Sequence, residues 1–116
     1  ICSGTAITTR AKKAGLDVEH AGDVYSLACS QNQTAIDIME DAKEYLANTI
    51  AIIYAFVDPE IVILGGSVAI KIVEDVEQRV KTKVYPNIQP LVKVVKTNLS
   101  EDSGLLGAAC LAFLQV

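Results

Sequence analysis

The sequence predicts an α/β fold in which a helical segment, residues 1–57, is followed by a β-α-β-α unit, residues 58–116. Apolar residues between Thr34 and Val57 recur every three or four positions, which is the period of one long helix. Ile61–Leu64 is an unbroken apolar run rich in β-branched residues, as in a strand of a parallel sheet. A second amphipathic stripe, from Ala69 to Val84, follows that run and predicts the crossover helix.

Size and composition favour one folded unit over residues 1–116. The chain has 116 residues, of which 51% are hydrophobic, enough for a core that needs neither a metal ion nor disulfides. A net charge of -4 argues against direct contact with nucleic acid or anionic lipid. The longest uncharged apolar run, Tyr45–Val57, is shorter than the roughly 20 residues of a spanning helix. Nothing at Ile1 resembles a signal peptide, so we expect a cytoplasmic chain without a membrane partner.

Two short helices are expected before the long one. Ser3 can cap a helix over Ala6–Ala14, and Gly15 can end it. Asp23 is expected to cap a second helix over Val24–Cys29.

The long helix is expected to end at Asp58-Pro59, because the residue before a proline is disfavoured in the helical region. Its second half, Ile50–Phe56, is apolar nearly all round and should be covered on more than one face. Its other side carries acidic residues that we interpret as a solvated face rather than a pair of catalytic carboxylates: Asp37, Glu40, Asp41 and Glu44.

The second half of the chain is expected to build a parallel sheet. Ile61–Leu64 should be buried on both faces, and Leu91–Thr97 should form the second strand. Asp75 and Arg79 are spaced to pair along the crossover helix, as are Glu77 and Lys81. A last helix over Gly104–Leu114, capped by Asp102 or Ser103, would present a face of small side chains.

The candidate binding residues are Gly65, Gly66 and Ser67, which lie between the carboxyl end of a strand and the start of a helix. Two glycines leave the backbone open to a ligand, and the first N–H groups of a helix suit hydroxyl or phosphate oxygens. A tight strand-to-helix connection also favours glycine, so this turn alone does not show that a ligand binds there. Neither the dinucleotide-binding nor the P-loop glycine pattern is present.

Other chemically active residue types are interpreted as structural. His20 has no second ligand at metal-binding spacing and is expected to be a solvated loop residue. Cys2, Cys29 and Cys110 lie among apolar neighbours and are expected to be reduced core residues. The sequence thus predicts no catalytic residue and no metal site within this chain.

Three blocks together with the long helix resemble the carboxyl-terminal part of the ROK family, named for repressors, open reading frames and kinases. Ser3–Ile7 is similar to the family's Ser-Gly-x-Ala helix start. Asp58–Ser67 is similar to its Asp-Pro-x-x-(apolar)-Gly-Gly segment, and Gly104–Ala109 to its closing Gly-Leu-x-Gly-Ala-Ala helix. The resemblance covers essentially the whole chain.

The resemblance implies part of an actin-like, hexokinase-type ATPase lobe of the ribonuclease H-like class. Gly65, Gly66 and Ser67 would lie near the adenosine of ATP, while Gly104 and Gly107 would serve close packing. The family's phosphate loop, catalytic Asp and zinc cluster with its sugar-binding Glu would lie upstream of Ile1. ATP, with Mg²⁺ in the intact parent, is the implied cofactor, and this chain alone is expected to be inactive.

The first functional hypothesis is a ROK-type sugar kinase, similar to glucokinase, that transfers the terminal phosphoryl group of ATP to a hexose. This chain would contribute the adenosine side of the nucleotide cleft. The alternatives are the sugar-sensing lobe of a ROK-type repressor, with a DNA-binding segment upstream, and a dimerisation module without catalysis. The family resemblance and the apolar long helix both predict a homo-oligomer.

Overall fold

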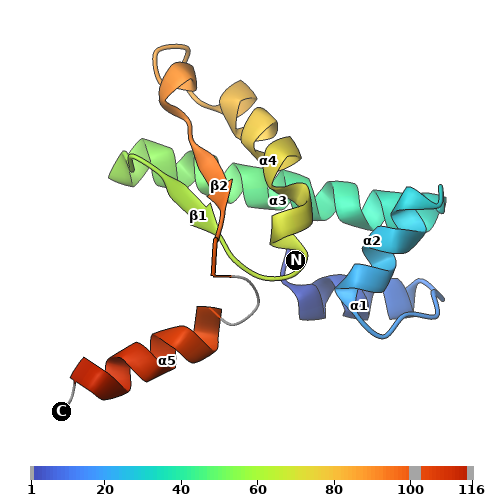
Figure 1. Ribbon diagram of the computed structural model, residues 1–116. Helices are drawn as coiled ribbons and strands as arrows, with labels where there is room; N and C mark the ends of the chain where they lie inside the picture. Colours follow the sequence, from blue (N-terminus) through green and yellow to red (C-terminus); the bar gives the residue numbers. More distant parts are fainter. Residues whose placement is uncertain (1, 100–102, 115–116) are drawn as a thin grey trace.

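The computed structural model describes residues 2–99 and 103–114 (Figure 1). Its elements, in chain order, are α1 (Gly4–Lys13), α2 (Ala21–Cys29), α3 (Gln33–Val57), β1 (Val62–Leu64), α4 (Ala69–Lys83), the 3-10 turn η1 (Gln89–Leu91), β2 (Val94–Lys96) and α5 (Ser103–Leu114). The mixed α/β class that the sequence predicts is therefore confirmed.

The first two helices begin at short polar signals. The Ser3 hydroxyl accepts a hydrogen bond from the Ala6 N–H at 3.2 Å, which caps α1 as expected, and Gly15 follows α1 at a φ of +83°. The N-cap residue of α2 is His20 rather than Asp23, so the expected start of this helix was wrong. Asp23 lies in the first turn, and its carboxylate accepts from the His20 N–H at 2.8 Å as part of a capping box.

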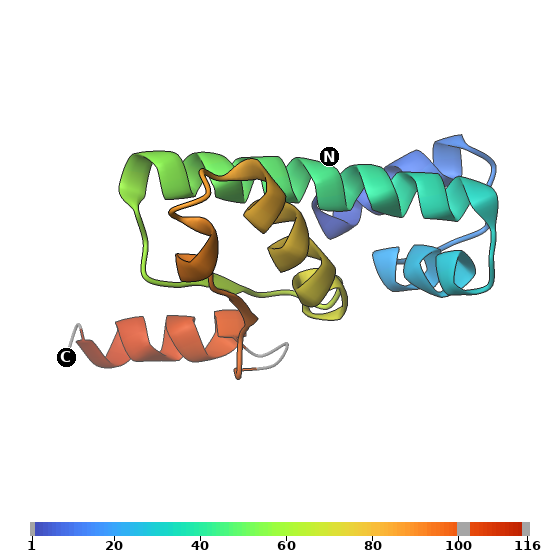
Figure 2. The same cartoon turned by 90° about the horizontal axis from the view of Figure 1, so that it is seen from above.

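The long helix α3 is the central element, and α1, α2 and α4 all pack on it (Figure 2). The Asn32 side chain accepts from the Ala35 N–H at 3.0 Å and starts the helix. Asp58 ends it in the left-handed region (φ 49°, ψ 57°), directly before Pro59, as the sequence predicts. Its buried side is a stripe of Ala35, Ile38, Met39, Ala42, Ala47, Ile50 and Tyr54.

The sheet has two parallel strands, with Val62 opposite Val94 in the register. Helix α4 connects them and buries Val76 and Val80 completely. The expected burial of Ile61–Leu64 on both faces was wrong, since the side chain of Ile63 is 61% exposed. Helix α4 packs on both strands, whereas Ile63 points away from the core.

Apolar surface is also exposed on α3 and α5. The second half of α3 is not covered on more than one face as predicted: Phe56 is 87% exposed, and Ile52 and Val57 are exposed too. Every position of α5 from Gly104 to Leu114 is exposed, and α5 stands apart from the other elements in Figures 1 and 2. The expected cap of α5 at Asp102 or the Ser103 side chain lies outside the described residues. None of the described helices combines the length and apolarity needed to cross a membrane.

The interpretation of the cysteines as core residues was wrong, because Cys2, Cys29 and Cys110 are all exposed. Cys2 precedes α1, Cys29 is the last residue of α2, and Cys110 lies on the uncovered α5. Apolar neighbours in the sequence did not predict burial, because these positions lie outside the packed stripes of the helices.

Ion pairs lie both along α4 and between α3 and α4. Along α4, the predicted pairs Asp75–Arg79 and Glu77–Lys81 are present, at 3.0 and 2.6 Å. The acidic side of α3 is partly solvated, as expected, but it is not free of partners: Glu40 and Glu44, whose side chains are 44% and 46% exposed, both pair with Arg79 of α4. The sequence pattern of α3 could not show that α4 would place a cation there.

Candidate functional site

The turn after β1 is open, as the glycine pattern predicts. Gly65, Gly66 and Ser67 are all exposed. Gly66 has a φ of +98°, a conformation that favours glycine. A Cβ added at Gly65 would lie 3.9 Å from Cγ2 of Thr97, an ordinary contact, and one at Gly66 would meet nothing within 4 Å. The backbone of this turn is therefore accessible to a ligand.

A cavity of about 470 Å³ lies beside this turn. Its lining comes from Ser67, from α1 and from the start of α2: Gly4, Thr5, Thr8, Thr9, Lys12, Glu19, His20, Ala21, Gly22 and Ser67. We call it the Ser67 cavity. Of the three predicted binding residues, Ser67 lines the cavity, while Gly65 and Gly66 lie in the turn that leads to it. The fold thus brings the Ser-Gly-Thr helix start and the Gly-Gly-Ser turn, far apart in sequence, to one place.

Helix α1 forms the first wall. Gly4, Thr8 and Lys12 follow one another at intervals of one helical turn, so they share a face, and Ile7 and Ala11 are fully buried on another. The Thr8 hydroxyl donates to the Gly4 carbonyl at 2.9 Å, and its oxygen keeps lone pairs that can accept from a ligand. This face presents hydroxyl groups and one ammonium group to the cavity.

The segment Glu19–His20 forms a second wall, and Asp23 anchors it. One carboxylate oxygen of Asp23 accepts from the N–H of His20 at 2.8 Å and from that of Glu19 at 2.9 Å. The hydrogen bond from the His20 N–H, and to a smaller extent the one from the Glu19 N–H, lowers the pKa of the Asp23 carboxyl below its ordinary value. The ionised carboxylate therefore holds the wall's backbone in place.

Sequence reasoning missed the residues of both walls. His20 is exposed, as expected, but it precedes the first residue of α2 and lines the Ser67 cavity. The polar residues Thr5, Thr8, Thr9 and Lys12 share one face of a short helix, which is a usable signal in the sequence. That signal indicates a polar surface, and it does not identify Ser67 as a residue of the same cavity.

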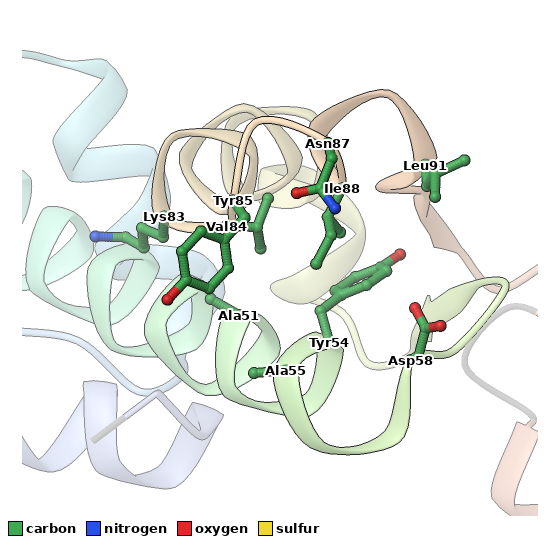
Figure 3. Close-up of a pocket in the computed structure, with 10 residues that line it drawn as sticks. All are labelled: Ala51, Tyr54, Ala55, Asp58, Lys83, Val84, Tyr85, Asn87, Ile88 and Leu91. Atoms are coloured by element: carbon green, nitrogen blue, oxygen red, sulfur yellow. The ribbon is translucent and has the colours of Figure 1, made fainter.

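A second cavity, also about 470 Å³, lies between the end of α3 and the segment that links α4 to η1 (Figure 3). Tyr54, Ile88 and Leu91 line it together with the small side chains of Ala51 and Ala55. It includes none of the residues predicted from the sequence to bind a ligand. We therefore take the Ser67 cavity as the candidate site.

Neither cavity supplies a metal centre. Among residues 2–99 and 103–114, no group of three or more His, Cys, Asp or Glu side chains lies close enough together to hold a metal ion. We assign Mg²⁺ to no residue of this chain. The Ser67 cavity offers hydroxyl, ammonium, imidazole and carboxylate groups, which suit the binding of a polar ligand.

The model of the ROK family matches residues 1–114. This chain belongs to the ROK family. Two similar proteins are each named bifunctional enzyme NanE/NanK, one from Brucella melitensis biotype 1 and one from Brucella suis biovar 1. Each is 32% identical over 120 residues, which cover 97% of this chain and 21% of the relative. This ROK chain therefore spans about a fifth of the length of these relatives.

Proposed function

We propose that this chain forms the adenosine side of the nucleotide cleft in an ATP-dependent sugar kinase of the ROK family. One observation carries the proposal: Ser67 and the first turn of α1 line the same cavity. These are two of the three places where the sequence resembles motifs of the family, and neither motif alone is specific.

The size and lining of the Ser67 cavity support a nucleoside as its ligand. Its volume of about 470 Å³ is within the range of about 300–1,000 Å³ that is usual for small-molecule sites. The positive charge of Lys12 and the negative charge of Glu19 balance each other in the lining. The cavity therefore favours a portion of a ligand that carries many hydrogen-bonding groups over one that is strongly charged. Adenine and ribose together fit that description.

The role of this chain is binding and orientation. When bound, ATP supplies the phosphoryl group that a sugar hydroxyl receives. The open backbone of Gly65 and Gly66 lets the nucleoside approach, and the Ser67 cavity holds it on one side. Phosphoryl transfer depends on precise positioning of the donor, so such a wall affects the rate without touching the reacting atoms.

The kinase hypothesis is favoured over the repressor because the similar proteins are named as enzymes. A repressor that keeps the same lobe would share the turn and the cavity. A homo-oligomer is a separate proposal, which does not depend on whether the parent is a kinase or a repressor.

Titration of the labelled chain with ADP, followed by backbone amide resonances, tests the proposal. We expect shifts at Gly66, Ser67 and Thr9, with none at Asn87 and Leu91, which line the second cavity and serve as an internal control.

The substitution G65V should abolish these shifts while the chain stays folded, since φ at Gly65 is not in the positive region. A wild-type chain whose turn resonances do not move at saturating ADP would overturn the proposal.

A further inference from the structure

Among the described residues that line the Ser67 cavity, Glu19 is the one acidic residue. Lys12 supplies the one ammonium group, and the other polar side chains there are three threonines, His20 and Ser67. Hydroxyl groups can both donate and accept hydrogen bonds and an ammonium group can only donate them, whereas an ionised carboxylate can only accept them. Glu19 therefore singles out the part of a ligand that donates.

Two neighbouring hydroxyl groups on a sugar ring are well matched to such an acceptor. Each hydroxyl donates one hydrogen bond, and the two oxygens of a carboxylate can accept both. Hydrogen bonds to an ionised group are stronger than those between neutral groups. In a nucleotide, the 2′- and 3′-hydroxyls of ribose are the groups with this arrangement.

The backbone of Glu19 is fixed before any ligand arrives. Its N–H donates to the Asp23 carboxylate at 2.9 Å, and the N–H of His20 donates to the same oxygen at 2.8 Å. Ala21, which follows, is 5% exposed and anchors the start of α2 in the core. A residue held on both sides loses less conformational freedom when it binds, which favours affinity.

We propose that Glu19 accepts hydrogen bonds from the ribose hydroxyls of the bound nucleotide and makes the Ser67 cavity select ribonucleotides over deoxyribonucleotides. This inference rests on the proposed function. It adds a specificity-determining residue that neither the turn motif nor the family resemblance assigns.

Calorimetric titration of the chain with ADP and with 2′-deoxy-ADP tests the proposal. We expect the wild-type chain to bind ADP about three- to tenfold more tightly, because the carboxylate loses one donor in the deoxy ligand. The variant E19A should weaken ADP binding by a similar factor and bind the two ligands almost equally.

The matched control is D17A, which removes the same charge two residues away from an exposed side chain that does not line the cavity. It should keep the wild-type preference, which separates a contact from a change in net charge.

The outcomes distinguish the two proposals. If the wild-type chain binds ADP but shows no preference, or if E19A keeps the preference, the role of Glu19 is overturned and the nucleotide site stands. If the wild-type chain binds neither ligand, both proposals fall. Loss of the preference in E19A but not in D17A supports Glu19 directly, and equal melting temperatures of the two variants show that the effect is local.

Discussion

The hydroxyl group of Tyr54 is hydrogen bonded to both backbone groups of Lys93. It donates to the Lys93 carbonyl at 3.1 Å and accepts from the Lys93 N–H at 2.9 Å. Tyr54 is only 2% exposed, on the buried side of α3, and Lys93 immediately precedes β2. The long helix thereby fixes the start of the second strand, and the carboxylate of Glu77 on α4 fixes the next residue by accepting from the Val94 N–H at 3.0 Å.

Replacing Tyr54 by phenylalanine should destabilise the chain by about 1 kcal/mol, because the partly buried N–H of Lys93 loses its hydrogen-bond partner. Chemical denaturation measures the change in the free energy of unfolding. Y85F is the matched control, since Tyr85 is 76% exposed and its variant should unfold like the wild type. Equal stability of Y54F and Y85F would contradict the structural role of the Tyr54 hydroxyl.

The ion pairs between α3 and α4 should make stability depend on pH in the acid range. The hydrogen bond from Lys43 lowers the pKa of Glu40, partial burial opposes this, and Arg79 lowers the pKa further. A carboxyl with a lowered pKa in the folded state binds protons less readily there than in the unfolded chain. Its stabilising contribution is therefore complete above about pH 5 and disappears as the pH falls through roughly 4 and below.

Unfolding measured from pH 6 to pH 3 tests this dependence. The variant E40Q should lose less stability over this pH range than the wild type does. The difference should be less than about 1 kcal/mol, because the ion pair between Glu40 and Arg79 is partly exposed. E60Q removes an exposed carboxylate that has no ion pair among the described residues and should follow the wild-type curve. If E40Q lost stability with falling pH as steeply as the wild type, the ion pairs of Glu40 would not contribute to the pH dependence.

The two glycines of the turn should respond differently to alanine. Gly66 has a φ of +98°, so G66A forces a side chain into a disfavoured conformation and should cost about 1–2 kcal/mol. Gly65 is not in the positive region, and its new Cβ would make an ordinary contact with Thr97, so G65A should change stability little. Thermal melting of both variants is sufficient, and a G66A variant as stable as G65A would contradict the described turn.

The exposed apolar surface of α3 should make the chain associate with itself. Phe56 is 87% exposed, and Ile52 and Val57 are exposed beside it. Contiguous apolar surface favours association because contact removes it from water. Sedimentation should show a mass that increases with concentration, and F56K should shift the equilibrium towards the monomer. A wild-type chain that stays monomeric and binds no apolar dye would count against a homo-oligomer.

Local signals in the sequence predicted much of the fold. Ser3 as a cap, Gly15 as a stop and Asp58-Pro59 as the end of α3 all act through their immediate neighbours, so their effects are visible in a short stretch of sequence. The same reasoning predicted the turn at Gly65 and Gly66. It was wrong where burial depends on a distant element, as at Ile63 and at Cys29.

By itself, the sequence determined the helices, the parallel strands between them and the open glycine turn, because hydrophobic period and turn chemistry operate over a few residues. Only the tertiary structure decided that Ser67 lines the same cavity as Thr5 and Glu19, and that Arg79 lies against Glu40. These neighbours come from separate helices whose packing is set by apolar stripes on their other faces. The sequence around a polar residue therefore does not identify the residue that it will contact.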